Sequence, residues 1–339
     1  MKKKLFNLII ILITAIALVI LSYSTSGNDE VTALLKSLKI SWIYTAILCM
    51  VLYWLFDALI FHIICRTLLE KFKFSNSLRF SMMGQFFNAI TPFSSGGQPL
   101  QAYCMIRDGV KPGHAVSILV IRSMVFQSCL FISSIIVFIL KASYFIKMVP
   151  QFLLFFLFGL FINLLVLLLC VLFLLNKAVA EKAVNFVFAI LKKVRIIKRP
   201  ERYVGKIETE LESFKEGVDA CRGKMTEIFK VVILQMIQFA AFFSIPFFIF
   251  KAMETGQGQF FNIFSTQAIL TMITLLVPTP GASGGAEGMS YLFLNHFFSS
   301  GHIMPSILIL RTITFYFNLI FGGLVSVISP EKPFKTITK

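Results

Sequence analysis

Four ionisable residues lie in stretches of the sequence that are otherwise apolar. Arg122 and Arg311 each lie well inside a long hydrophobic segment, Asp57 lies in the middle of another, and Glu287 follows a Gly-Gly pair. A guanidinium can clamp a phosphate through two parallel hydrogen bonds, and a carboxylate can pair with it, bind a cationic group or carry a proton. Ionisable residues in apolar surroundings indicate a binding site, although buried pairs that only staple helices together would explain them too.

Two similar polar motifs interrupt the apolar sequence. TPFSSGG at 91–97 and TPGASGG at 279–285 are identical at five of seven positions, at an offset of 188 residues. Pro and Gly break helices, and the backbone N–H groups of a Gly pair at a helix end can form an anion-binding nest. The alternative is a small-residue motif that lets helices approach closely. The candidate substrate-binding residues in these motifs are Thr91, Pro92, Gly96, Gly97, Gln98, Thr279, Pro280, Gly284 and Gly285.

The segment after each motif repeats as well. ILVIRSMVF at 118–126 aligns with ILILRTITF at 307–315 at an offset of 189 residues, which places the two arginines opposite each other. Two matches at nearly the same offset indicate an internal duplication. We expect repeat one at about 40–140 and repeat two at about 228–328.

The composition indicates the class of protein that must position these residues. Of the 339 residues, 57% are hydrophobic and only 14% are charged, whereas soluble domains carry about 25% charged residues. We therefore expect an all-α integral membrane protein with a single membrane domain, 1–339. The net charge of +16 then marks cytoplasmic loops rather than a nucleic-acid partner. The six scattered cysteines favour neither a disulfide framework nor a zinc site, and we expect no metal or cofactor.

About six apolar stretches are long enough to cross a bilayer as helices. Two others, 80–90 and 262–277, are too short or too interrupted, and each precedes one of the polar motifs. We interpret them as the first arms of two re-entrant hairpins, 80–106 and 262–298. The expected spans are 5–23, 40–64, 115–140, 149–175, 228–250 and 303–328.

The distribution of positive charge predicts the direction of these spans. With the N-terminus in the cytoplasm, only five of the 32 Lys and Arg residues fall in the expected outside loops, as the positive-inside rule requires: Lys36, Lys39, Lys141, Lys147 and Lys251. Both termini then lie in the cytoplasm, and the two repeats are inverted relative to each other. Segment 177–224 becomes a cytoplasmic amphipathic connector, which lies on the inner surface or packs on the spans, either as a plain connector or as a docking surface for anionic lipid or a partner.

Inverted repeats with broken helices are typical of secondary transporters, whose sites lie where the repeats meet. We expect Arg122, Arg311 and Glu287 to face a shared cavity there. Asp57 is a further candidate substrate-binding residue, because an ionisable residue in the middle of a span indicates a site, and the alternative is that it neutralises one of the arginines. His62 is expected at the membrane interface. Further polar residues of the apolar segments are expected to line the cavity or to hydrogen-bond between helices: Gln85, Asn88, Gln101, Gln127 and Asn318.

TPGASGGAEG at 279–288, followed by an arginine-bearing span, resembles the lysylphosphatidylglycerol synthase transmembrane family, the flippase-like domain of the multiple peptide resistance factor. The resemblance covers about 5–328. At 91–102 the match is weaker, because Gln98 stands where the analogy expects an acidic residue. We therefore expect Glu287, as the acidic residue of the two hairpin loops, to pair with an arginine, bind a cationic headgroup or carry a proton without an acidic counterpart in the first hairpin.

The resemblance implies a flippase of the cytoplasmic membrane that moves a phospholipid such as lysylphosphatidylglycerol, or a glycolipid, between leaflets. We expect the family's soluble aminoacyl-transferase domain, and hence enzyme activity, to be absent. Related stand-alone members imply polyprenyl-phosphate transport as an alternative. An integral-membrane enzyme of lipid headgroups, an accessory to a separate lipid-modifying synthase and a small-solute transporter also stay open, as does the oligomeric state.

Overall fold

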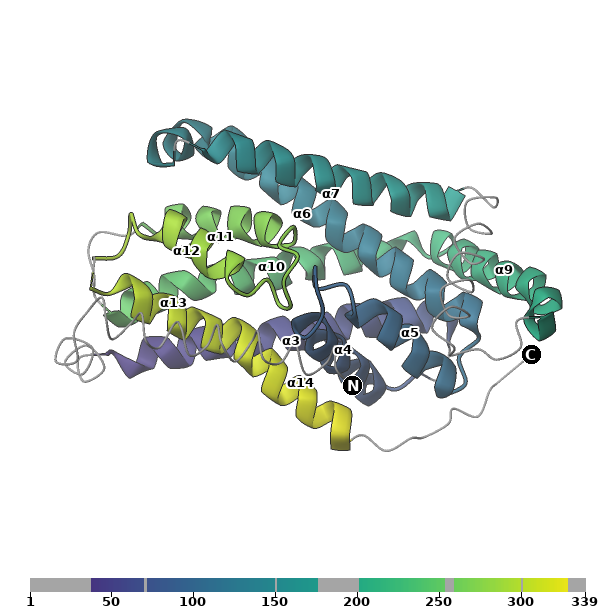
Figure 1. Ribbon diagram of the computed structural model, residues 1–339. Helices are drawn as coiled ribbons and strands as arrows, with labels where there is room; N and C mark the ends of the chain where they lie inside the picture. The colour runs from purple at the N-terminus through teal and green to yellow at the C-terminus, as the bar shows by residue number, and fades with distance from the viewer. Residues whose placement is uncertain are drawn as a thin grey trace.

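The computed structural model describes residues 38–69, 72–149, 151–175, 201–253, 259–299 and 301–328, with the backbone alone at 175 and 201–211. Within these ranges the chain consists of helices and their connecting loops (Figure 1). The elements are α3 (Ile40–Leu68), α4 (Phe74–Ala89), α5 (Gly97–Arg107), α6 (Pro112–Met148), α7 (Phe152–Leu175), α9 (Glu201–Arg222), α10 (Met225–Met253), α11 (Phe260–Thr274), α12 (Gly285–Leu294), α13 (Ile303–Arg311), the π-helix η1 (Thr312–Tyr316) and α14 (Phe317–Ile328).

Five helical runs among the described residues are long and apolar enough to cross a membrane. They are α3, α6, α7, α10 and the continuous run α13–η1–α14, and they confirm five of the six expected spans. The remaining expected span, 5–23, lies outside the described residues. Over the described residues the chain is therefore all-helical, with five candidate membrane-spanning helices.

Helix α6 is longer than the sequence suggested. It begins with Pro112 at its first turn, where a missing N–H costs nothing, and runs for 37 residues, about 55 Å. Residues 141–148, expected to form an outside loop, continue this helix. That expectation was wrong because Phe145 is fully buried and stacks on Phe152 of α7, with ring centroids 5.0 Å apart. The aromatic packing holds the last turns in helical form beyond the apolar segment.

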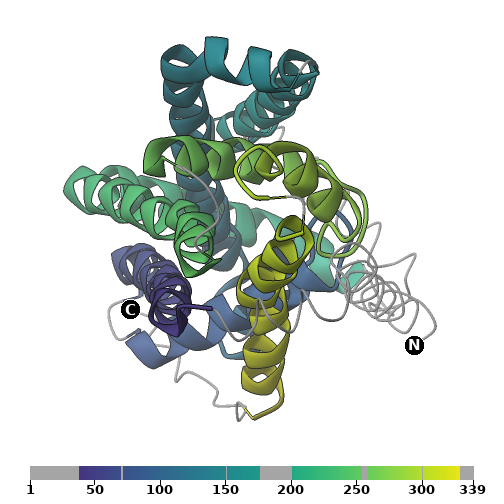
Figure 2. The ribbon, with the colours of Figure 1, turned by 90° about the vertical axis from the view of Figure 1, so that its left-hand side faces the viewer.

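Helices α3 and α10 pack as an antiparallel pair along one side of the bundle (Figures 1 and 2). Helix α7 lies on the outside of the bundle and contacts α6 and α11. Helix α9 packs against α6 and α3, and its side chains Phe214 and Val218 are buried. Of the two arrangements expected for the connector, α9 thus adopts packing on the spans, while 176–200 lie outside the described residues. Burial also raises the pKa of the Cys221 thiol in this helix.

Two helix–loop–helix hairpins fill the middle of the bundle. In one, α4 leads through 90–96 into α5, and in the other, α11 leads through 275–284 into α12. Figure 1 shows that the α4–α5 hairpin opens toward the right-hand end of the bundle and the α11–α12 hairpin toward the left-hand end. Their tips meet near the centre, where an isolated antiparallel bridge joins Pro92 to Pro280.

Candidate functional site

The two hairpin tips share an unusual backbone conformation. Pro92 and Pro280 stand at matched positions of the two sequence motifs, 188 residues apart. The next two residues of each loop lie in the left-handed region: Phe93 at φ 54°, Ser94 at 49°, Gly281 at 58° and Ala282 at 56°. This region is costly for residues other than glycine, and such strain gathers at functional sites. The similarity between the loops therefore extends from sequence to backbone geometry.

In the first loop, side chains hold the backbone of the glycine pair. The Thr91 hydroxyl oxygen accepts the Gly96 N–H at 2.8 Å, and Asn88 Oδ1 accepts the Gly97 N–H at 2.8 Å. A Cβ on Gly97 would lie 2.6 Å from the Gly84 carbonyl oxygen, so the position requires glycine for close approach. The expected nest of exposed N–H donors is wrong for this pair, because both donors are already bonded within the hairpin.

The second loop is closed by its own acidic residue. Glu287 is the third residue of α12, and its Oε2 accepts the Gly284 N–H at 2.6 Å, which caps the helix. The Thr279 hydroxyl donates to the Ser283 carbonyl at 2.7 Å. The Gly284 N–H is therefore not an exposed donor either. Gly285 serves packing, since a Cβ there would lie 2.6 Å from the Val277 side chain.

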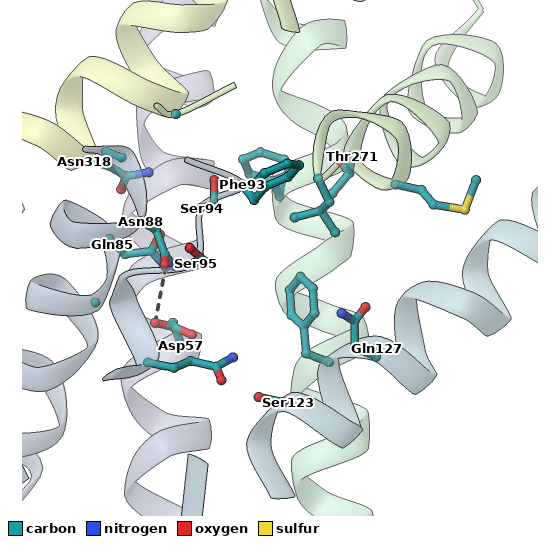
Figure 3. Close-up of a pocket in the computed structure, with 18 of the residues that line it drawn as sticks. Asp57, Gln85, Asn88, Phe93, Ser94, Ser95, Ser123, Gln127, Thr271 and Asn318 are labelled. Atoms are coloured by element: carbon teal, nitrogen blue, oxygen red, sulfur yellow. Dashed lines mark hydrogen bonds between the residues drawn. The ribbon is translucent and has the colours of Figure 1, made fainter. Parts of the chain in front are cut away.

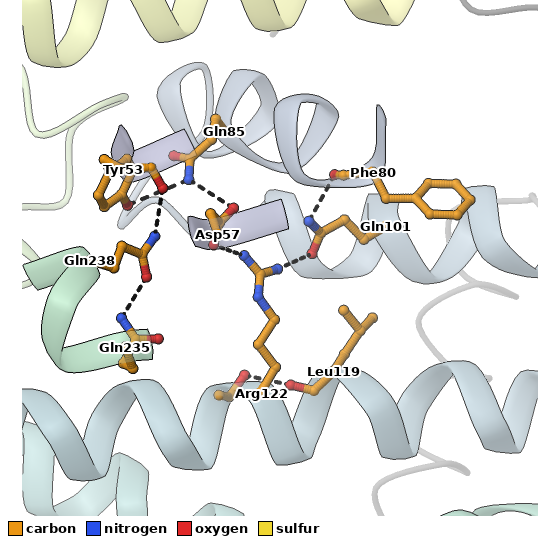
Figure 4. A network of polar contacts seen from close by, with 10 residues as sticks. Tyr53, Asp57, Phe80, Gln85, Gln101, Leu119, Arg122, Gln235 and Gln238 are labelled. Carbon is orange, nitrogen blue, oxygen red and sulfur yellow. Dashed lines mark hydrogen bonds and ion pairs between the residues drawn. The ribbon is translucent and has the colours of Figure 1, made fainter. Parts of the chain in front are cut away.

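Arg122 lies at the centre of a polar network that joins α6 to α3, α4 and α5 (Figure 4). Its guanidinium forms an ion pair with Asp57 of α3, and its Nη1 donates to Gln101 Oε1 of α5 at 3.1 Å. Gln101 in turn donates to the Phe80 carbonyl of α4 at 2.9 Å, and Gln85 donates to Asp57 Oδ2 at 3.4 Å. The first arginine is thus positioned by α3 and by both arms of the first hairpin.

Arg311 is held entirely by the second half of the chain. Its Nε forms an ion pair with Glu287 Oε1 at 2.7 Å, and its Nη2 donates to the Gly281 carbonyl at 3.1 Å. The guanidinium carbon lies 4.2 Å from the centre of the Phe315 ring. The π-helix η1 begins at the next residue, Thr312. Such π-helical turns occur frequently at functional sites.

A cavity of about 760 Å³ lies between the hairpin tips and the surrounding helices (Figure 3). Both arginines line it, and so do Asp57 and Gln98. The other predicted site residues are not part of its lining: Thr91, Pro92, Gly96, Gly97, Thr279, Pro280, Gly284, Gly285 and Glu287. The expectation that Glu287 faces the shared cavity is wrong, because its carboxylate is turned toward Gly284 and Arg311.

Sequence reasoning also missed several polar residues that line the cavity. The residues expected as cavity or interhelix polar groups all contribute: Gln85, Asn88, Gln101, Gln127 and Asn318. The missed ones are Tyr53, Ser81, Ser94, Ser95, Ser123, Asn163, Gln235, Thr271 and Thr314. Asn163 carried a usable signal, because it is the one amide in the otherwise apolar sequence of α7. The neutral and charged groups together can bind a polar headgroup with an anionic centre.

Comparison with known proteins agrees with this architecture. Residues 7–322 match the family described as Lysylphosphatidylglycerol synthase TM region. Over 322 residues the chain is 26% identical to a UPF0104 membrane protein of Archaeoglobus fulgidus, with 92% of this chain and 94% of that protein covered. The name of that relative places it in a membrane and states no activity. The family resemblance seen in the sequence is therefore confirmed.

Proposed function

Because the chain belongs to the lysylphosphatidylglycerol synthase transmembrane family, we propose that it moves a phospholipid or glycolipid between the leaflets of the cytoplasmic membrane. The observation that carries this proposal is the presence of Arg122 and Arg311 on one cavity, at the junction of two hairpin tips. A lipid phosphate that crosses the hydrocarbon layer needs compensation for its lost water. Two guanidinium groups can supply it through charge-assisted hydrogen bonds.

We interpret the two hairpins as re-entrant and the two halves as an inverted repeat. Helix α4 has 16 residues, about 24 Å, which is shorter than the roughly 30 Å hydrocarbon core. The opposite openings of the hairpins support the inversion (Figure 1). Irregular backbone at membrane depth is tolerated where it lines a cavity, as Phe93 and Ser94 do. With the basic connector in the cytoplasm, the α4–α5 hairpin opens inward.

In this mechanism the two arginines have different roles. Arg122 is bonded to Asp57 and Gln101, and a lipid phosphate entering the cavity would replace part of these contacts. Asp57 keeps the guanidinium from lying unpaired in the empty cavity, which would cost several kcal/mol. Arg311 remains held by Glu287 and the Gly281 carbonyl, and it adds positive potential from the opposite tip.

Reconstitution in liposomes tests the proposal. The full chain is inserted into vesicles that contain fluorescent phosphatidylglycerol, and movement of the label between leaflets is followed by quenching from outside. We expect protein-dependent movement that is slowed in Arg122→Gln and unchanged in Arg222→Gln, an exposed arginine of α9 that is not part of the cavity lining. Equal rates in vesicles with and without protein would refute lipid movement, and saturable solute flux without it would support a solute transporter instead.

A further inference from the structure

Helix α7 has one narrow buried face, and a single amide lies on it. The buried residues Phe152, Phe156, Gly159 and Asn163 are spaced for one side of a helix, toward α6 and α11. The first two are aromatic packing residues, and Gly159 approaches Met272 closely. Asn163 is only 5% exposed, so a polar group is buried where the helix otherwise presents apolar surface.

The hydrogen bonds of Asn163 are incomplete. Its Nδ2 donates to Gln127 Oε1 of α6 at 2.6 Å. Its carbonyl oxygen is buried and has no hydrogen-bond partner among the described residues. A buried acceptor without a partner costs about 1–3 kcal/mol. A purely structural amide would not need to face a polar cavity, yet both Asn163 and Gln127 line it.

The lining residues next to this amide pair on its own two helices are neutral. The nearest lining residues along the same helices are Phe126, Ile162 and Val166, and none of them carries a charge. An ammonium group would have no carboxylate there, whereas a hydroxyl would gain an acceptor without burying a charge. Ser81, beside the Arg122 network, also has a buried hydroxyl without a partner.

We propose that Gln127 and Asn163 form a subsite that recognises a hydroxyl group of the lipid headgroup while Arg122 holds its phosphate. The inference rests on the proposed function and names its substrate class, a hydroxyl-bearing headgroup such as glycerol or a sugar. Gln127 and Arg122 lie five residues apart on α6, about 7.5 Å along the helix, and both line the cavity. A lipid whose headgroup is a bare phosphate would leave the Asn163 carbonyl unsatisfied.

The test compares two lipids that differ only in hydroxyl groups. Phosphatidylglycerol and phosphatidylpropanol with identical short acyl chains carry the same charge, and their binding to the purified full chain in detergent is measured by calorimetry. We expect the protein to bind phosphatidylglycerol about three- to tenfold more tightly, the effect of one hydrogen bond. Asn163→Leu removes the acceptor oxygen and should bring the ratio of the two affinities to about one.

A matched control comes from α11. Gln267 also has a buried side-chain oxygen without a partner among the described residues, but it is not part of the cavity lining. Gln267→Leu should keep the ratio of phosphatidylglycerol to phosphatidylpropanol affinity that the unmodified protein has. If Asn163→Leu does not fold, Asn163→Ala replaces it with the same expected affinity ratio, because it also removes the acceptor oxygen.

The outcomes separate this inference from the proposed function. Equal binding of the two lipids by the unmodified protein, or a ratio unchanged by Asn163→Leu, would overturn the hydroxyl subsite alone. The proposed function and the subsite would be overturned together if neither lipid bound and if Arg122→Gln had no effect on lipid movement in liposomes. If Gln267→Leu also brought the ratio of the two affinities to about one, the preference would depend on any buried amide, and the subsite would be overturned.

Discussion

Arg122 and Arg311 occupy matched positions in the two halves of the chain, yet their negative partners come from different places. Arg122 pairs with Asp57 of α3, a helix that precedes the first hairpin. Arg311 pairs with Glu287, which belongs to the second hairpin itself and also caps α12. The first site is therefore assembled from several elements, whereas the second joins its arginine to a single hairpin.

The two arginine side chains also differ in solvent exposure. The side chain of Arg122 is 17% exposed, against 10% for Arg311, and the Arg122 network reaches neutral glutamines whose bonds can be exchanged. Arg311 is fixed on three sides by a carboxylate, a carbonyl and the Phe315 ring. Arg122 also lies over a ring, that of Phe61, but at 5.3 Å. Under the proposed function, this difference favours Arg122 as the arginine that exchanges ligands and Arg311 as the one that holds a loop, although the sequence motifs look alike.

The largest expected effect follows from breaking the second pair. Glu287→Ala leaves Arg311 buried without its carboxylate and removes the cap on Gly284, so we expect a loss of about 3–5 kcal/mol in unfolding free energy. Glu287→Gln should cost less, because an amide oxygen still accepts the Gly284 N–H. Denaturant unfolding in detergent micelles measures both variants.

Asp57→Asn is the matching change in the first site. We expect a smaller loss of about 1–3 kcal/mol, because the partly exposed Arg122 retains Gln101 as a partner. If Asp57→Asn destabilised the protein as strongly as Glu287→Ala, the distinction between an exchangeable and a fixed site would be wrong.

The next effect concerns transport rather than stability. Arg122→Gln should lower the rate of lipid movement about 10- to 100-fold, the loss of a charge-assisted hydrogen bond worth about 1.5–3 kcal/mol. Arg122→Lys should recover only part of the rate, since an ammonium lacks the planar fork. Rates per folded protein in liposomes test this, and a larger loss in Arg311→Gln would reverse the assigned roles.

Much of the architecture could be predicted from the sequence. Pro92 and Pro280, each followed by a glycine pair, interrupt apolar segments that are too short to span, so the two hairpins were expected. The charge partner of Arg122 was foreseen only as an alternative for Asp57. The partners lie 65 residues apart in sequence, and periodicity alone does not fix which helices meet.

The misassigned residues have physical explanations. Glu287 was expected in the cavity, but a glutamate at the third position of a helix can reach back to accept the N–H of the N-cap residue, which is the half of a capping box that a glycine N-cap allows. The glycine pairs were expected to offer backbone donors, whereas Thr91, Asn88 and Glu287 already accept them. Such side-chain contacts depend on the tertiary fold of each loop.

A further prediction concerns the strained positions of the two loops. Gly281→Ala places a Cβ at φ 58°, where it would lie 2.0 Å from a Phe315 ring carbon. We expect a loss of about 2 kcal/mol from left-handed strain and overpacking. Ser94→Gly, one residue beyond the matched position of the first loop, should instead stabilise by up to about 1 kcal/mol, because Ser94 has φ 49°. Thermal unfolding of both variants tests this, and a Ser94→Gly variant less stable than the unmodified protein would contradict strain at that position.

The smallest effect is expected from weakening the hydrogen bond between Gln101 and Arg122. Gly84 of α4 lies against Gln101, and a Cβ there would be 2.2 Å from Gln101 Nε2. Gly84→Ala should therefore displace the amide from Arg122 and cost about 1 kcal/mol, the value of one hydrogen bond. The clash is with the end of a flexible side chain, so the backbone need not move. Because the Asp57 pair remains, transport should fall only about two- to fivefold. A loss as large as that of Arg122→Gln would mean that Gln101, rather than Asp57, is the partner that positions the guanidinium.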